Sequence, residues 1–278
     1  MQTSENTYYY LDTAIQANYY PSAKPAIATV IYYHGGGLIF GTRKDLPEAY
    51  IKLFLENNMN VLLMDYLLAP ESSLDDIHDS VLAGIEWYLE EVAEQDLPYV
   101  LFGRSGGAYL ILNAAHRLKE TNLKPPSALI SFYGYYCFDK PEFILPSQYY
   151  LQMPRMKSDV LNTTVGSSPI SNGRLHERFP LYLYLRQSGQ WVFRLTGNDP
   201  EKYALTEEDL AYLPTTFLTA SRGDYDVPYV FSRTMGQKIP QAKFHPVSSN
   251  EHDFDREPSP KNLMLYQQVI DWLVEVLG

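Results

Sequence analysis

The chain has 278 residues, of which 45% are hydrophobic and 20% charged, and its formal net charge is −11. This composition is typical of a folded globular protein, and the length suits one α/β domain with an insertion. The negative charge, without any basic cluster, argues against nucleic acid and anionic membranes as partners and favours a small molecule.

Strand and helix patterns alternate along the first half of the chain. The tyrosine-rich residues 7–25 predict a hairpin of edge strands. A helix should begin after Ser73, whose side chain can cap it together with Asp76 three residues later. Further along we expect strands at 26–33, 60–66, 98–103 and 127–134 and helices at 46–57, 73–92 and 107–120.

The alternation stops at about residue 139 and resumes at about 213. In the last part we expect strands at 215–220 and 242–247, a helix at 228–238, and a final helix that starts at Pro260. Repeated strand–helix units predict a mostly parallel sheet with helices on both faces. The segment 139–213 has weak periodicity, and we expect it to form a lid-like insertion at the carboxyl ends of the strands, where chemistry collects in such folds.

Three consecutive glycines follow the strand expected at 26–33, in the stretch His34 to Gly37. Bare backbone at the end of a strand suits a flexible turn, a phosphate-binding loop or an oxyanion hole. Phosphate binding is not supported, because neither this stretch nor the later glycine run matches G-x-x-x-x-G-K-[ST] or G-x-G-x-x-G. The choice between a turn and an oxyanion hole depends on what the other strand ends carry.

A second glycine-rich stretch, Gly103-Arg104-Ser105-Gly106-Gly107, has the pattern G-x-S-x-G between an expected strand and an expected helix. In that context the pattern is typical of a nucleophile elbow, a strained turn that exposes the serine hydroxyl. Side chains at the flanking glycine positions would clash with neighbouring elements. Ser105 is therefore the candidate nucleophile, rather than an ordinary turn serine.

A serine hydroxyl needs a base at neutral pH, and histidine is the usual one. His78 and His116 fall within expected helices, His176 lies in the insertion, and His245 lies inside an expected strand, so structural or surface roles are expected for them. His252 falls in the loop between the last strand and the last helix. From there it can reach the carboxyl edge of the sheet, and it is the candidate base.

The base in turn needs an orienting carboxylate. The loop after the strand at 215–220 supplies two, Asp224 and Asp226. We expect Asp224 to orient His252, with Asp226 as the alternative. Whichever aspartate does not take this role is expected to cap the helix that starts near Pro228.

The order Ser105, Asp224, His252 is the chain order of the α/β-hydrolase triad. The chain resembles the α/β-hydrolase superfamily and, within it, the hormone-sensitive-lipase-like esterases. The motifs that carry the resemblance are HGGG at 34–37, DYLLAPE at 65–71, GRSGG at 103–107, DYDVP at 224–228 and HDF at 252–254. The elbow departs from that family's common GDSAG at Arg104 and Gly106.

The resemblance implies an α/β-hydrolase fold and a triad in which His252 takes the proton of Ser105. It implies an oxyanion hole made by the backbone N–H groups of Gly36, Gly37 and Gly106, so that His34 shapes the loop and is not the base. No metal or organic cofactor is required by this chemistry, and the sequence has neither H-E-x-x-H nor paired cysteines.

We therefore expect a carboxylic ester hydrolase whose partner is a small-molecule ester with a small or medium acyl chain. An amidase, peptidase or formamidase would use the same triad, and a non-catalytic ligand receptor is known in this family, so both alternatives stay open. Tyr135 and Tyr136 could line the pocket or pack in the core.

The location of the protein can also be inferred from the sequence. The first thirty residues lack the features of a signal peptide, and no apolar run reaches about 18 residues, so we expect a cytoplasmic protein without stable membrane insertion. The sequence does not indicate the oligomeric state.

Overall fold

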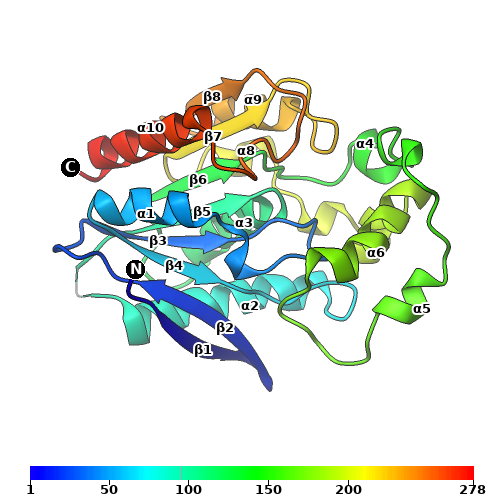
Figure 1. Ribbon diagram of the computed structural model, residues 1–278, viewed down its shortest axis with the longest axis horizontal. Coiled ribbons are helices and arrows are strands. Elements are labelled where there is room, and N and C mark those ends of the chain that lie inside the picture. Colours follow the sequence, from blue (N-terminus) through cyan, green and yellow to red (C-terminus); the bar gives the residue numbers. More distant parts are fainter. Residues whose placement is uncertain (95) are drawn as a thin grey trace.

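An eight-stranded sheet runs through the computed structural model, which describes residues 1–94 and 96–278 (Figure 1). The strands are β1 (Ser4–Tyr10), β2 (Thr13–Tyr20), β3 (Ala28–Tyr33), β4 (Met59–Met64), β5 (Tyr99–Arg104), β6 (Ala128–Phe132), β7 (Thr216–Ser221) and β8 (Lys243–Val247). Their order across the sheet is β1-β2-β4-β3-β5-β6-β7-β8. From β4 to β8 all neighbours are parallel, which confirms the predicted mostly parallel sheet.

The N-terminal hairpin differs from the expectation in one respect. Strand β2 is antiparallel to β1 on one side and to β4 on the other, so of the two hairpin strands only β1 is an edge strand. The alternation in β2 explains the pairing, because Ile15 and Ala17 are buried while Gln16 between them is only partly buried. A strand that is half buried on one face can still lie inside the sheet.

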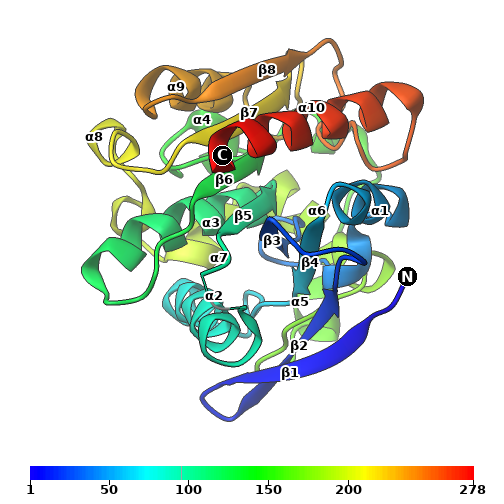
Figure 2. The same ribbon diagram turned by 90° about the vertical axis from the view of Figure 1, so that its left-hand side faces the viewer.

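Helices cover both faces of the sheet (Figure 2). The helices outside the insertion are α1 (Glu48–Glu56), α2 (Leu74–Trp87), α3 (Gly106–Arg117), α9 (Val230–Lys238) and α10 (Pro260–Leu277). Val30 and Tyr32 of β3 pack in the cluster that contains residues of α1 and α10. Their neighbours Ile31 and Tyr33 pack in the cluster that contains residues of α2 and α3. This two-residue alternation follows from the strand geometry, and it places one hydrophobic core on each face.

Several single-turn elements complete the chain outside the insertion. They are η1 (Arg43–Asp45), the π-helical turn η2 (Tyr88–Val92) that continues α2, and η3 (Leu118–Glu120). Helix α2 begins as predicted, because the Ser73 side chain accepts a hydrogen bond from the Asp76 N–H and the Asp76 carboxylate accepts one from the Ser73 N–H. This reciprocal capping satisfies two N–H groups that the helix leaves unpaired.

The segment 139–213 is mostly built of short helices. They are α4 (Pro141–Ile144), η4 (Tyr150–Gln152), α5 (Val160–Thr164), α6 (Leu175–Ser188), α7 (Trp191–Thr196), η5 (Glu201–Tyr203) and α8 (Glu207–Leu210). Helices α4, α5 and α6 lie beyond the carboxyl ends of the central strands (Figure 1). The weak periodicity of α6 has a physical cause, since Pro180 lies inside it and the charged residues Arg178 and Arg186 are buried with the apolar ones.

The order in which the chain adds strands to the sheet changes direction at β3, and this switch point positions the candidate site. After β3 the chain crosses to β4 on one side, whereas β5 pairs with the opposite side of β3. The loops that leave β3 and β5 therefore diverge and leave a crevice at the carboxyl ends of these strands. The glycine stretch follows β3 and Ser105 follows β5, so the fold brings both to this switch point.

Candidate active site

Ser105 lies in a sharp turn between β5 and α3. Its backbone angles, φ 52° and ψ −118°, are rare for a residue with a side chain. The turn is possible because its neighbours are glycines: a Cβ on Gly103 would lie 2.3 Å from the Gly107 carbonyl oxygen, and one on Gly107 would lie 2.2 Å from the Tyr33 carbonyl oxygen. The burial of α3 from Gly106 to Ala115 holds the turn in place.

The fold brings Ser105, His252 and Asp224 together. The His252 Nε2 lies 2.9 Å from the Ser105 Oγ, and its Nδ1 lies 2.7 Å from the Asp224 Oδ2. The other oxygen of Asp224 accepts hydrogen bonds from two backbone N–H groups, those of Asp226 at 2.8 Å and Val227 at 2.9 Å. The carboxylate is thus fixed on one side by its own loop and faces the imidazole on the other.

The carboxylate of Asp226 forms a buried ion pair with Arg186 of α6. Its oxygens also accept hydrogen bonds from the hydroxyl groups of Tyr150 and Tyr182. Burial has the largest single effect and raises the pKa of Asp226, but Arg186, His252 and the two tyrosine hydroxyl groups together outweigh it and hold the pKa below its usual value. The prediction that the second aspartate caps the following helix is wrong, because α9 begins at Val230 without a side-chain cap.

The environment of His252 favours its charged form. Burial has the largest single effect and lowers the pKa of the imidazole, but the Asp224 carboxylate beside Nδ1 and two further aspartates together outweigh it and raise the pKa to about 9. Asp226 and Asp253 act in the same direction. The pair can therefore stabilise an imidazolium, which is the state that forms when this residue accepts a proton.

The glycine stretch after β3 presents free backbone donors beside Ser105. Gly36 and Gly37 have positive φ angles of 99° and 58°, and a Cβ on Gly106 would lie 3.4 Å from the Gly37 nitrogen. Within residues 1–94 and 96–278, the N–H groups of these three glycines donate to no backbone carbonyl. The two loops that carry these N–H groups meet beside Ser105.

The DYLLAPE segment packs against the loop that carries the glycine stretch and forms hydrogen bonds with it. The hydroxyl group of Tyr66 donates a hydrogen bond of 2.8 Å to the His34 carbonyl oxygen, and the two rings stack at 4.3 Å. The Ala69 N–H donates to the Leu38 carbonyl oxygen at 2.8 Å. His34 is buried and its Nδ1 lies 2.8 Å from the Gly35 carbonyl oxygen. It therefore packs within the loop and does not contact Ser105 through a hydrogen bond.

Arg104 and Asp255 form a second buried ion pair, which the sequence did not suggest. The Arg104 Nη2 lies 3.1 Å from the Asp255 Oδ1, and both side chains are almost fully buried. Tyr133 and Tyr266 donate hydrogen bonds of 2.7 Å to the same carboxylate. The pair joins the elbow to the loop that carries His252, and the Tyr133 ring also packs edge-on against the His252 ring at 4.7 Å.

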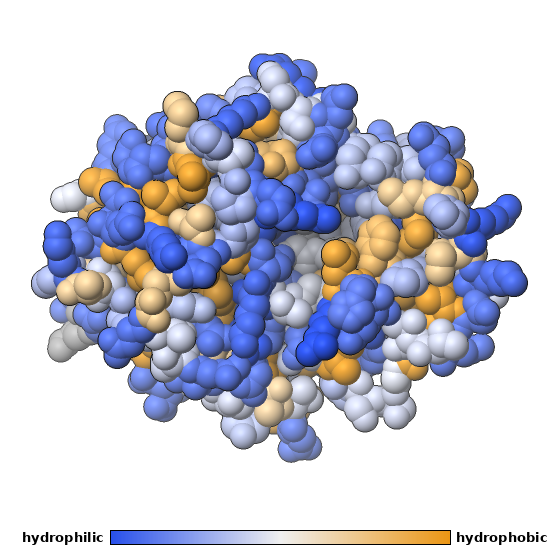
Figure 3. Space-filling model, in the orientation of Figure 1, coloured by the Kyte–Doolittle hydropathy of each residue, from blue (hydrophilic) through white to orange (hydrophobic). Residues whose placement is uncertain are grey.

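A cavity of about 570 Å³ opens over Ser105 and His252. Its wall combines residues of the glycine stretch with aromatic and arginine side chains from the insertion, among them Tyr149, Tyr150, Phe179, Tyr182 and Arg174. On the face shown in Figure 3 the surface is hollowed near its middle, and apolar side chains border the hollow on the side of the insertion. The volume is in the range of small-molecule sites.

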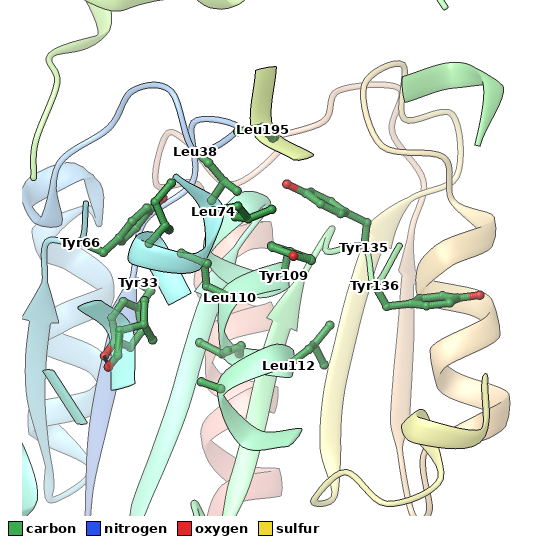
Figure 4. Packing of buried hydrophobic residues seen from close by; sticks show 14 of the residues in the cluster. Tyr33, Leu38, Tyr66, Leu74, Tyr109, Leu110, Leu112, Tyr135, Tyr136 and Leu195 are labelled. Atoms are coloured by element: carbon green, nitrogen blue, oxygen red, sulfur yellow. Dashed lines mark hydrogen bonds between the residues drawn. The ribbon is translucent and has the colours of Figure 1, made fainter. Parts of the chain in front are cut away.

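Tyr135 and Tyr136, just after β6, pack in the core and do not line this cavity. The Tyr135 ring stacks on Tyr109 of α3 at 5.1 Å (Figure 4). It also meets the Trp191 ring edge-on. Of the two roles that the sequence left open for these tyrosines, packing is the one observed. The packing links α3 to the insertion.

The other histidines lie away from Ser105. His78 is buried beside Tyr109, and burial lowers its pKa to about 3, so it is neutral. His116 is partly exposed on α3, His176 is exposed in the insertion, and His245 lies in β8 as expected. In the part of the chain that the structure describes, no three His, Cys, Asp or Glu side chains are arranged to hold a metal ion.

None of the helices among the described residues is both long enough and apolar enough to cross a membrane.

Comparison with known families places the chain in one of them. Residues 30–225, well over half of the sequence, match the family described as the alpha/beta hydrolase fold. The chain belongs to the α/β-hydrolase fold family. The fold and the superfamily predicted from the sequence are thereby confirmed.

Two solved structures resemble this hydrolase over nearly its whole length. An alpha/beta hydrolase superfamily protein from Enterococcus faecalis is 33% identical, with 99% of each chain covered and a TM-score of 0.87. A protein of unknown function from Staphylococcus aureus is 29% identical, with 99% of this chain and 100% of that chain covered and a TM-score of 0.90.

Curated relatives of the hydrolase match it only in part. A probable carboxylesterase from a Phoma species is 29% identical over 139 residues, which are 45% of this chain and 42% of the relative. A non-reducing polyketide synthase from Penicillium rubens is 30% identical over 139 residues, which are 46% of this chain but only 6% of the synthase. The matched part is thus a small fraction of the synthase.

Proposed function

We propose that this protein is a serine hydrolase that cleaves carboxylic esters of small or medium acyl chains. The observation that carries the proposal is the continuous hydrogen-bonded arrangement of Ser105, His252 and Asp224 beside free backbone N–H groups. Membership of the α/β-hydrolase fold family and the similarity to a probable carboxylesterase support it.

In the proposed reaction, the Ser105 hydroxyl attacks the ester carbonyl while His252 Nε2 accepts its proton. The short contact between Nε2 and Oγ, 2.9 Å, is within the range for this transfer. Asp224 accepts a hydrogen bond from the Nδ1–H group of His252, which leaves Nε2 as the proton acceptor. It also stabilises the imidazolium that forms.

The tetrahedral intermediate carries a negative charge on the former carbonyl oxygen. We assign its stabilisation to the N–H groups of Gly36, Gly37 and Gly106, because each lacks a backbone partner within the described residues. Donors that are already oriented cost no reorganisation when the charge develops, and removing one such donor typically costs about 10²–10³ in kcat.

Collapse of the intermediate breaks the bond to the alcohol, which leaves with the proton that His252 returns. A water molecule then attacks the acyl-enzyme, with His252 again accepting a proton, and Ser105 is released together with the carboxylic acid. The cycle is balanced without any further reactant.

The cavity supports a substrate of modest size. Its volume of about 570 Å³ suits a small or medium ester, and the walls are aromatic at Phe40, Phe179 and Tyr182. Aromatic rings favour apolar groups by burial, so the acyl or alcohol part of the ester that meets them should be apolar.

The proposal is tested by labelling the protein with a fluorophosphonate probe and mapping the adduct. Nitrophenyl esters of increasing acyl length are then assayed beside the matching anilides, with Ser105→Ala and His252→Ala as controls. We expect the adduct on Ser105 and faster turnover of short and medium esters than of long ones. Both variants should lose nearly all activity.

Three outcomes would contradict parts of the proposal. Failure to label Ser105 would remove the serine-hydrolase mechanism and favour a ligand receptor. Turnover of anilides at rates similar to esters would indicate an amidase or peptidase. Full activity of the His252→Ala variant would require another base.

A further inference from the structure

The conformation of Gly37 decides where its N–H group points, and glycine by itself does not fix that conformation. With a φ angle of 58° and no Cβ, Gly37 could rotate at little steric cost. The Gly36 carbonyl accepts hydrogen bonds from Ile39 at 3.0 Å and Phe40 at 3.1 Å. Because the C=O and N–H of one peptide unit point in opposite directions, these bonds orient the Gly37 N–H.

The next peptide unit is held by the insertion. The indole Nε1 of Trp191, the first residue of α7, donates a 2.9 Å hydrogen bond to the Gly37 carbonyl oxygen. The Tyr182 ring lies against the Gly37 Cα, where a Cβ would approach a ring carbon to 2.4 Å. Both peptide units that flank Gly37 are thereby fixed, the first by its own turn and the second by Trp191.

The indole itself is rigidly placed. Trp191 is buried, and its ring meets Tyr135, Phe143 and Tyr182 edge-on at 5.2–6.2 Å. The guanidinium of Arg186 lies over the same ring, 5.0 Å from its centre. Because the indole is packed on several sides, it cannot move together with the Gly37 carbonyl. The hydrogen bond therefore fixes the position of the glycine stretch relative to the indole.

A second set of bonds from the insertion holds the end of the glycine stretch. The Nε of Arg178 donates to the Ile39 carbonyl oxygen at 2.6 Å, while its Nη1 and Nη2 each bind the Glu71 carboxylate at 2.8 Å. Gly41 and Gly173 exchange two backbone hydrogen bonds of 2.7 Å and 2.9 Å. The segment 139–213 thus forms hydrogen bonds with Gly37 and, just after the glycine stretch, with Ile39 and Gly41.

We propose that Trp191 and Arg178 are positioning residues for the oxyanion hole, and that the insertion is a fixed part of the catalytic framework and not a mobile cover. This inference rests on the proposed function, since it concerns how the Gly37 N–H is aimed at the oxyanion. Neither residue is expected to contact the ester.

The test compares Trp191→Phe with Trp272→Phe. The first variant keeps an aromatic ring but removes the N–H donor to Gly37. The second is a matched control, because Trp272 is a similarly buried tryptophan of α10 that packs against Phe217 on the other face of the sheet. Both are measured well below their unfolding temperatures, by the rate of fluorophosphonate labelling, by kcat and KM for a nitrophenyl ester, and by inhibition with a trifluoromethyl ketone.

Loss of a direct oxyanion donor costs about 10²–10³ in kcat, so loosening one should cost less, roughly 10-fold. We expect Trp191→Phe to label about 10-fold more slowly, to lower kcat by a similar factor, and to weaken the ketone, which forms an oxyanion when bound. KM should stay within about twofold, and Trp272→Phe should behave like the wild type.

Two results would overturn the inference. If Trp191→Phe lowers the unfolding temperature but labels at the wild-type rate, Trp191 has only a structural role. If the wild-type protein itself does not react at Ser105, the proposed function fails and the inference fails with it. The reaction of the wild-type protein therefore distinguishes failure of the proposed function from failure of the inference alone.

Arg178→Lys provides an independent measurement should Trp191→Phe not fold. Lysine keeps a positive charge opposite Glu71 but cannot also donate to the Ile39 carbonyl in the same planar geometry. We expect slower labelling with KM nearly unchanged, whereas the control Arg194→Lys, at an exposed position of α7, should label normally. Equal labelling by both variants would contradict the role of Arg178.

Discussion

Arg186 of α6 lies 2.7 Å from the Oδ1 of Asp226, while His252 binds Asp224, two residues earlier in the same loop. The loop after β7 therefore carries two buried carboxylates with separate partners. One faces the imidazole, and the other binds the insertion to the sheet. This difference leads to opposite expectations for substitutions at the two positions.

Replacing Asp224 with asparagine should remove most of the activity and leave the fold intact. The amide can keep a hydrogen bond to His252 Nδ1, but it favours the wrong tautomer and does not stabilise the imidazolium. In a related triad the same change lowers kcat about 10⁴-fold. Steady-state kinetics with a nitrophenyl ester, together with circular dichroism, measure the effect. A loss of less than about 10-fold would show that Asp224 does not act as the orienting acid.

Replacing Asp226 with asparagine should mainly destabilise the fold. Arg186 is nearly fully buried, and without the carboxylate its charge has no ionic partner. Breaking a buried pair in this way costs about 3–5 kcal/mol in the free energy of unfolding. Urea unfolding of the wild type and the variant measures this loss in the free energy of unfolding.

The control for this prediction replaces both partners. Asp226→Leu combined with Arg186→Met removes the pair without leaving a charge, so its free energy of unfolding should lie closer to that of the wild type. If the double variant were less stable than Asp226→Asn alone, the penalty would come from lost packing and not from the unpaired arginine.

Activity should rise with pH on the alkaline side of neutrality. His252 must be neutral to accept the Ser105 proton, and its pKa is raised from 6.5 to about 9 in the folded protein, because Asp224, Asp226 and Asp253 together outweigh the lowering effect of burial. The profile of kcat/KM against pH reports this ionisation in the free enzyme. We expect a rise with a midpoint near pH 9, and a midpoint at or below 6.5 would contradict it.

The same ionisation affects stability with the opposite sign. A pKa raised in the folded state means that protonated His252 stabilises the fold, fully below pH 6.5 and decreasingly as the pH rises through about 9. The difference in unfolding temperature between the wild type and His252→Gln should therefore shrink between pH 6.5 and 9. A difference that grew with pH would show that the folded-state pKa is lowered.

Gly107→Ala should strongly destabilise the fold. The added Cβ would lie 2.2 Å from the Tyr33 carbonyl oxygen and 2.5 Å from that of His34, both backbone atoms of the central strand and its loop. Overpacking of this kind costs about 1–3 kcal/mol, and more where backbone must shift. The control is Gly166→Ala, where nothing lies within 4 Å of the new Cβ. Thermal unfolding compares the two, and equal midpoints would contradict the steric account.

Asp255→Asn should destabilise the protein by about 3–5 kcal/mol, because it leaves the Arg104 guanidinium buried without a counter-charge. Asp253→Asn is the matched control in the same loop, since Asp253 pairs with the exposed Arg256 and such pairs contribute about 0–1 kcal/mol. Denaturant unfolding measures both. Similar small losses for the two variants would mean that the buried pair does not hold the loop of His252.

Much of the fold and the proposed site follows from signals that are local in the sequence. Two apolar runs predict strands that end in an unusual backbone conformation. They are the run at 28–33, which glycines follow, and the run at 99–104, which Ser105 follows. Because parallel strands end at one edge, these local signals were enough to predict that Ser105, Asp224 and His252 would lie near one another.

The remaining features depend on contacts between distant residues. Arg104 and Asp255 are 151 positions apart, and no sequence pattern identifies one as the partner of the other. Arg178 and Arg186 look like surface residues of a poorly patterned segment. Both are buried, and each pairs with a carboxylate from another part of the chain: Arg178 with Glu71, and Arg186 with Asp226. A buried charge is recognisable only together with its partner, which the sequence does not identify.

The hydrogen bonds from Trp191 and Arg178 to the glycine stretch have a consequence for engineering this enzyme scaffold. Grafting a foreign segment in place of 139–213, in order to widen the pocket, would also remove the donors that bind the Gly37 and Ile39 carbonyls. Substrate range and turnover rate would then change together. A library that varies the pocket-facing side chains of α6, while keeping both donors, separates the two properties.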